Sequence, residues 1–167
     1  LFTIEKIDIK FFKSAPNRKD KFYIQPMLDI IYSNMGQFKH CQKELGLFLS
    51  KIASINFTWF IRKQLNKLIQ KDFFQFNAEA VLFSAIIILS NESIIIQNDK
   101  SGEKPPNDQL ISQFKKSIID LCQKVMDDQP IDLFRTKCWI FDTNDFTKSL
   151  SLNSLNYEIE QIIDHTS

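Results

Sequence analysis

Apolar residues in the first half of the chain recur every three or four positions, and this spacing predicts four helices. The predicted helices span residues 26–36, 37–52, 58–72 and 77–91. Pro26 suits the first turn of the first helix, and Asn77 is a suitable N-cap for the fourth, which is the most apolar and is expected to be central. The residues expected to face the core are Met27, Ile30 and Ile31 in the first helix, Phe38, Cys41, Leu45, Phe48, Leu49 and Ile52 in the second, and Ile61, Leu65, Leu68 and Ile69 in the third.

The pattern changes after the fourth predicted helix. The β-branched run at residues 93–97 predicts a short buried strand, and residues 98–107, with Gly102 and the pair Pro105-Pro106, have the composition of a linker. The long helix expected after Asn107 has a regular apolar stripe, formed by Leu110, Ile111, Phe114, Ile118, Leu121, Cys122 and Val125. Residues 137–141 and 146–150 predict a hairpin, and the residues around Ile159 predict a last helix.

This order of elements predicts a mainly α fold with short β-strands. Three helices, a strand and a Gly/Pro turn, followed by a helix and a hairpin, are the order of a winged helix, present once or twice in tandem. The expected divisions are a strand and basic connector at 1–21 from a preceding domain, a first winged-helix-like unit at 22–98, and a smaller second unit at 107–167. The second unit has few apolar side chains with which to form a stable core of its own, so we expect it to pack on the first unit as one rigid body.

Charge is divided unevenly between the two halves of the chain. Residues 1–76 carry 13 Lys or Arg against 6 Asp or Glu, and residues 77–167 carry 8 against 14, so a net charge of +7 is followed by −6. Such polarity suits the steering of a polyanion or an acidic partner to one end of the molecule.

Basic residues in the first half are the candidate binding residues. Lys63, Lys67 and Lys71 follow one another at four-residue spacing, which predicts one exposed flank of the third helix. With their neighbour and the basic connector, the candidate set is Arg18, Lys19, Lys21, Arg62, Lys63, Lys67 and Lys71. One interpretation is a solvated helix face, and the other is contact with phosphate groups or with an acidic partner, without base readout.

No pattern typical of catalysis or of a cofactor site accompanies these charges. The three cysteines, Cys41, Cys122 and Cys138, lack metal-ligand or redox spacing, and they are expected to be reduced core residues. The two histidines, His40 and His165, lack a second ligand cluster. The three scattered glycines cannot form a phosphate-binding loop. The sequence therefore predicts a protein that is not an enzyme, with no metal and no cofactor, and its apolar runs are too short to predict a membrane span.

Residues 86–99, from Ile86 to Asp99, resemble the passage from recognition helix to wing in the C-terminal half of the STN subunit of the telomere-capping CST complex, a relative of the middle subunit of replication protein A. The helix at 110–122 is similar to the one that opens the second winged helix of that subunit, so the resemblance covers about residues 80–125. It implies a non-catalytic protein-interaction domain in a telomere or replication complex that binds single-stranded DNA and recruits polymerase or telomerase components. The implied partners are protein subunits of that complex and single-stranded DNA, with no membrane, and the implied location is the nucleus, at telomeres.

Two further expectations concern the origin of the chain. It begins at Leu1 with an alternating apolar and polar run, which indicates a piece of a longer protein. Residues with A/T-only codons are abundant, with 24 Ile, 18 Lys, 16 Phe and 11 Asn, and 12 Gln residues are scattered through the chain. This composition indicates an A/T-rich genome and favours a ciliate source.

Overall fold

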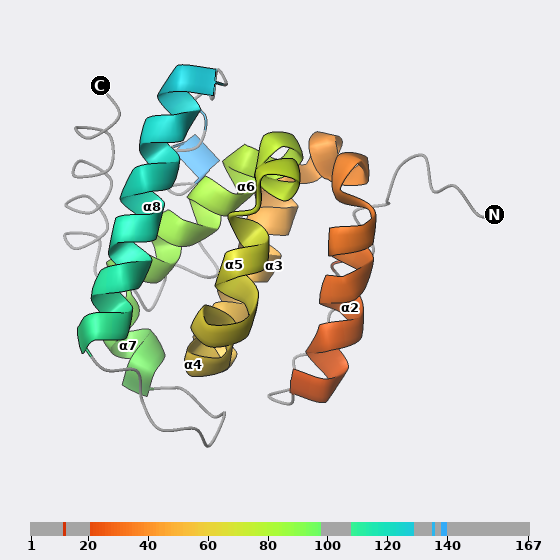
Figure 1. The fold of residues 1–167 in the computed structure, drawn as a ribbon. Coiled ribbons are helices and arrows are strands. Elements are labelled where there is room, and N and C mark those ends of the chain that lie inside the picture. Colours follow the sequence, from red (N-terminus) through yellow and green to blue (C-terminus); the bar gives the residue numbers. More distant parts are fainter. Residues whose placement is uncertain (1–11, 13–20, 98–107, 129–134, 136–137, 140–167) are drawn as a thin grey trace.

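The computed structural model describes Phe12, residues 21–97, residues 108–128, and Arg135, Cys138 and Trp139. Its elements are α2 (Lys21–Ser33), the 3-10 helix η1 (Met35–Cys41), α3 (Gln42–Ile55), α4 (Phe57–Trp59), the π-helical turn η2 (Phe60–Gln64), α5 (Leu65–Leu68), α6 (Lys71–Ser90), α7 (Glu92–Gln97) and α8 (Asp108–Asp128). Figure 1 shows α2 at one edge of the bundle and α8 at the other, with α5 between them. The described residues are almost entirely helical and contain no strand, which confirms the prediction of a mainly α fold.

Helices α3 and α6 form the centre of the bundle, and a glycine lets them approach closely. A Cβ atom placed on Gly46 of α3 would lie 2.4 Å from the Phe83 ring and 3.0 Å from the Ala80 carbonyl oxygen, both on α6. By length and composition α6 could also cross a membrane, but 78% of its most apolar window is buried inside the fold. Its apolar character is therefore that of a central helix, as the sequence predicts.

Burial confirms the second predicted helix and corrects the first. All six core-facing residues predicted for residues 37–52 are buried, over η1 and α3. In α2 the buried stripe is Ile24, Leu28 and Ile31, whereas Ile30 is 40% exposed. The helix begins five residues before Pro26, which therefore lies inside it. This longer helix places Ile24 and Leu28 on the core side, so the predicted inward position of Ile30 is wrong.

Helix α6 is interrupted at Asn77, where the backbone is not helical (φ −128°, ψ 28°). The sequence predicts that Asn77 caps the helix that follows, but the Ala80 amide N–H donates instead to Oε1 of Gln42 on α3, at 3.1 Å. The Asn77 side chain accepts a hydrogen bond from Gln42 Nε2 at 3.1 Å and donates one to the Met35 carbonyl at 2.9 Å. A glutamine from another helix thus satisfies an amide that would otherwise lack a partner at this helix start.

The predicted strand at residues 93–97 is wrong, because these residues belong to α7. Asn91 leaves the helical conformation at the end of α6 (φ −130°, ψ 20°), and the chain resumes a helix with the Ile95 amide bonded to the Asn91 carbonyl at 2.9 Å. Ile95 is 3% exposed and belongs to the core. A short β-branched run does not distinguish a strand from a buried helix, and here tertiary packing decides for the helix.

The helix that follows the predicted linker, α8, packs on α6. Phe114 is 1% exposed and meets Phe57 of α4 edge-on, with ring centroids 6.3 Å apart. Farther along the chain, Arg135 forms an ion pair with Glu79 of α6, and the Trp139 ring lies edge-on to Phe83 of α6 at 6.0 Å. Residues of both predicted units therefore belong to one apolar core.

Several predictions fall partly or wholly outside the described residues. These are the strand and basic connector at 1–21, of which only Phe12 and Lys21 are described, the linker at 98–107 and the last helix around Ile159. Of the predicted hairpin only Cys138 and Trp139 are described, and both are helical, so the predicted strand at 137–141 is wrong at these two positions. The division into domains stays a prediction.

Candidate binding surface

The predicted basic residues that the structure describes are exposed and lie close together in sequence, on three consecutive elements. Arg62 and Lys63 belong to η2, Lys67 to α5, and Lys71 is the first residue of α6. We call these four residues the basic face. Arg18 and Lys19 lie outside the described residues, and Lys21 begins α2 with a side chain that is not described.

The four residues of the basic face do not share one continuous α-helix, which corrects the prediction. In η2 the Leu65 amide bonds to the Phe60 carbonyl, five residues back, so the helix is wider there and four-residue spacing no longer corresponds to one turn. The helix then ends at Leu68, and Gln70 is extended (φ −61°, ψ 142°) before α6 begins. The break brings Lys71 onto a new helix.

All exposed side chains between Phe60 and Lys71 carry hydrogen-bond donors. The set consists of Arg62, Lys63, Asn66, Lys67, Gln70 and Lys71. The sequence has no Asp or Glu between Glu44 and Asp72, and within the described part of the chain no ion pair joins Lys63 or Lys71 to a carboxylate. The chemistry of this surface suits an anion with many acceptor oxygens.

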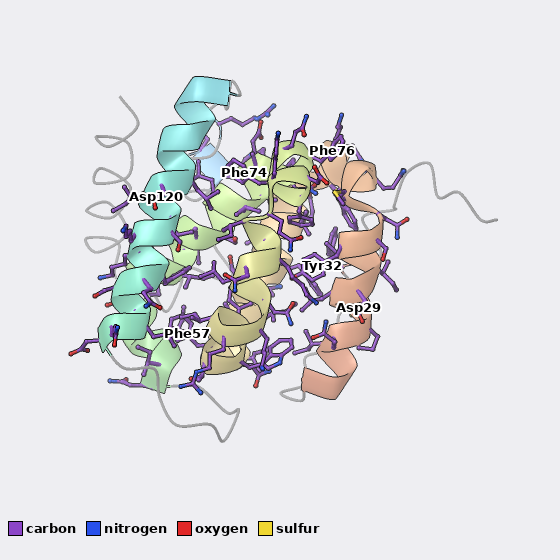
Figure 2. All side chains as sticks on the ribbon, viewed as in Figure 1. Asp29, Tyr32, Phe57, Phe74, Phe76 and Asp120 are labelled. Carbon is purple, nitrogen blue, oxygen red and sulfur yellow. The ribbon has the colours of Figure 1, made fainter. Side chains whose placement is uncertain are left out.

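A row of hydrogen bonds behind the basic face connects α2 with η2. The Tyr32 hydroxyl donates to Oε1 of Gln64 at 2.9 Å, and Gln64 Nε2 donates to Oε1 of Gln25 at 2.9 Å. Gln25 Nε2 donates in turn to the Asp29 carboxylate at 2.8 Å. Gln64 is only 1% exposed, so these bonds satisfy an amide that would otherwise be buried without partners. Figure 2 labels Tyr32 between α2 and α5 and Asp29 on α2.

Tyr32 connects this row of hydrogen bonds to the basic face. The Lys67 ammonium lies over its ring, 5.3 Å from the ring centroid, which is within cation–π range. The same ring also meets the core, where the Phe73 ring lies edge-on to it with centroids 5.3 Å apart. Burial of the hydroxyl raises the pKa of Tyr32 well above its usual range, and the Asp29 carboxylate raises it further. Tyr32 therefore keeps its proton and remains a donor to Gln64.

The raised pKa of Tyr32 predicts a specific loss of stability in alkali. An unfolded tyrosine ionises near pH 10, whereas folded Tyr32 holds its proton to higher pH, so its contribution is complete below about pH 10 and is lost as the pH rises further. We expect Tyr32→Phe to lower the free energy of unfolding by about 1 kcal/mol at pH 7, because Gln64 loses a donor. We also expect the variant to lose less stability than the wild type between about pH 10 and pH 11.5. Urea unfolding across this range measures both effects, and parallel pH profiles for the two proteins would contradict the prediction.

A second feature of the surface is the exposed aromatic side chain of Phe76. Phe76 is 37% exposed, and the Lys39 ammonium lies over its ring at 5.0 Å from the centroid. It immediately precedes the helix interruption at Asn77, and its carbonyl lies 3.5 Å from Gln42 Nε2. Only Phe76 and Ile30 are exposed large apolar residues in the described part of the chain. The buried Gln42 and Asn77 therefore fix the backbone that presents this ring.

The titratable and nucleophilic groups that the structure describes form no metal-binding group of three or more. Cys41 is buried in the core as predicted, and neither it nor half-buried Cys138 is in a disulfide. The Cys122 side chain is not described. His40 is exposed on η1, as expected for a surface histidine.

Sequence reasoning missed Tyr32, Gln64 and Gln42. The available signal was position, because Gln64 falls between Ile61 and Leu65 on the apolar side of its helix, and Gln42 directly follows Cys41 in the buried stripe. A glutamine at such a position needs a buried partner. The partners come from α2 and α6, more than 30 residues away in each case.

Comparison of the chain with protein-family models, curated proteins and solved structures found no match.

Proposed function

We propose that this chain is a non-catalytic, helical protein-interaction domain, and that Phe76 is the centre of its contact with a protein partner. The observation that carries the proposal is the exposure of the Phe76 ring on a fixed backbone. Large aromatic residues are common among those that dominate binding energy at protein interfaces, particularly when the surrounding backbone is rigid. Phe76 combines exposure with a backbone fixed by the hydrogen bonds of Gln42 and Asn77, and Lys39 beside it supplies a positive charge for an acidic group on the partner.

In its more specific form, the proposal places the domain in a nuclear complex of telomeres or replication that binds single-stranded DNA. There it would recruit polymerase or telomerase components. This form is supported by the resemblance over residues 80–125. The part of the resemblance at residues 93–97 concerned a wing strand, and these residues are helical. A winged helix would therefore have to take its strands from outside the described residues.

Affinity purification of the full-length protein, followed by reconstitution with the purified companion, tests this proposal. We expect the companions to include subunits of a single-strand DNA-binding complex, and we expect Phe76→Ala to raise the Kd for the direct partner about 30-fold, as for a residue that dominates an interface. Ile30→Ala is the matched control, because Ile30 is the other exposed large apolar residue, and it should leave the Kd within about twofold. Equal losses in the two variants, or none in either, would contradict the assignment of Phe76.

The second candidate function is direct binding of nucleic acid, and the composition of the basic face favours it. Between Phe60 and Lys71 this surface exposes donors and cations without a carboxylate or an exposed aromatic ring, so it suits a phosphate backbone better than it suits an apolar peptide or stacked bases. The division of charge in the sequence, +7 in residues 1–76, would bring a polyanion toward the same half of the chain.

A further inference from the structure

The ammonium of Lys67, one of the cations of the basic face, has a fixed neighbour in the Tyr32 ring. Its Nζ atom lies 5.3 Å from the centroid of the Tyr32 ring, and the Tyr32 hydroxyl is bonded to Gln64, which precedes Lys67 by three residues and is 1% exposed. The Tyr32 ring that contacts Lys67 is therefore itself fixed by the buried side chain of Gln64, three residues before Lys67. This arrangement limits the conformations of a side chain that is otherwise long and exposed.

We infer that the basic face binds the sugar–phosphate backbone of a nucleic acid strand, and that Tyr32 is a positioning residue that holds the Lys67 ammonium toward a phosphate. The inference rests on the second candidate function. Lysine is a point donor that contacts phosphate oxygens without reading bases. An ammonium has three N–H donors, so contact with the ring on one side leaves donors for a phosphate on the other.

The chemistry of the surface favours a nucleic acid backbone over an acidic peptide. Exposed side chains between Phe60 and Lys71 are polar or cationic, and none of them offers the apolar contact area that an amphipathic peptide would need. A backbone needs only closely spaced donors, and four cations within ten residues supply them. Binding should therefore be independent of base sequence and should weaken steeply with salt.

A double-mutant cycle on the full chain separates positioning from a merely structural role. The four proteins are the wild type, Tyr32→Leu, Lys67→Ala and the double variant, and the measurement is fluorescence anisotropy with a mixed-sequence 20-nucleotide DNA, single-stranded and duplex, between about 50 and 200 mM salt. We expect Lys67→Ala to reduce the slope of log K against log salt by about 0.7 for the single strand and about 0.9 for the duplex. We expect Tyr32→Leu to weaken binding about threefold at low salt, as for loss of one exposed cation–π contact, and to have no further effect in the Lys67→Ala background.

Each outcome bears on a stated part of the inference. If Tyr32→Leu weakens binding equally with and without Lys67, or not at all, the positioning role is wrong while nucleic-acid binding stands. If the wild type binds neither DNA at tens of micromolar protein and low salt, the second candidate function fails and the inference fails with it. An acidic peptide that binds the wild type as tightly as DNA, and loses affinity equally in Lys67→Ala, would overturn the nucleic-acid assignment. Should Tyr32→Leu not fold, Tyr32→Phe replaces it in the cycle, because it keeps the ring but removes the hydroxyl that fixes it, and a smaller coupling of the same sign is then expected.

Discussion

Phe114→Asp should unfold both predicted halves of the protein together, with a loss of about 5 kcal/mol in the free energy of unfolding. Phe114 is on α8, is 1% exposed, and packs edge-on against Phe57 of α4. The substitution removes the ring contacts and places a carboxylate among the apolar groups of the core. Figure 2 shows Phe57 between α4 and α8, so the loss of the Phe114 ring would weaken the packing of both helices.

Thermal unfolding followed by circular dichroism and by tryptophan fluorescence measures this effect. Buried Trp59 reports on the first predicted unit and Trp139 on the second, so single-tryptophan versions of the protein follow the two units separately. Both probes should show one transition at the same temperature in the wild type. Gln113→Asp is the matched control, because it introduces the same charge at an exposed position one residue earlier, and it should change stability by less than about 0.5 kcal/mol. Separate melting temperatures for the two tryptophans in the wild type would show that the halves are independent.

Long apolar stripes were the part of the fold that the sequence predicted best. The stripe from Phe38 to Ile52 is buried as predicted, and Phe114, Ile118 and Leu121 of α8 enter the core as the stripe after Asn107 predicts. In both cases the helical period persists over at least three turns, so no other regular structure places the same residues on one side.

Shorter patterns failed where a contact from elsewhere in the chain decides the structure. The run at 93–97 is too short for its period to be read, and it forms α7 because Ile95 finds a place in the helical core. Asn77 marks a helix start as predicted, but Gln42, which is 35 residues away in sequence, supplies the cap. Such a partner is visible only after α3 and α6 have packed.

The candidate binding surface was predicted in composition but not in geometry. The exposure of Arg62, Lys63, Lys67 and Lys71 follows from their charge, since burial without a partner would be costly. Their distribution over η2, α5 and α6 could not be predicted, because the wide turn at 60–64 and the break at Gln70 carry no Gly or Pro. The contact of Lys67 with Tyr32 likewise depends on how α2 lies against α5.

Gly46→Val should lower the free energy of unfolding by about 4 kcal/mol, and Gly46→Ala by about 2 kcal/mol. Even the Cβ atom of alanine would lie 2.4 Å from Cδ1 of Phe83 and 3.0 Å from the Ala80 carbonyl oxygen. Phe83 is fully buried and its ring meets Trp139 edge-on, so it cannot turn aside without disturbing a second contact. The Ala80 carbonyl belongs to the backbone of α6, so relieving that contact requires the two central helices to separate.

Helix propensity acts in the opposite direction and provides the control for this prediction. Alanine is favoured over glycine inside a helix by about 1 kcal/mol. If Gly46 had no role in packing, Gly46→Ala would therefore stabilise the protein. Gly36→Ala is the matched variant, because a Cβ atom at Gly36 meets nothing within 4 Å, and it should be neutral or slightly stabilising. Chemical unfolding of the three variants decides between the two effects. If Gly46→Ala stabilised the protein as much as Gly36→Ala, the close approach of α3 and α6 would not require a glycine at position 46.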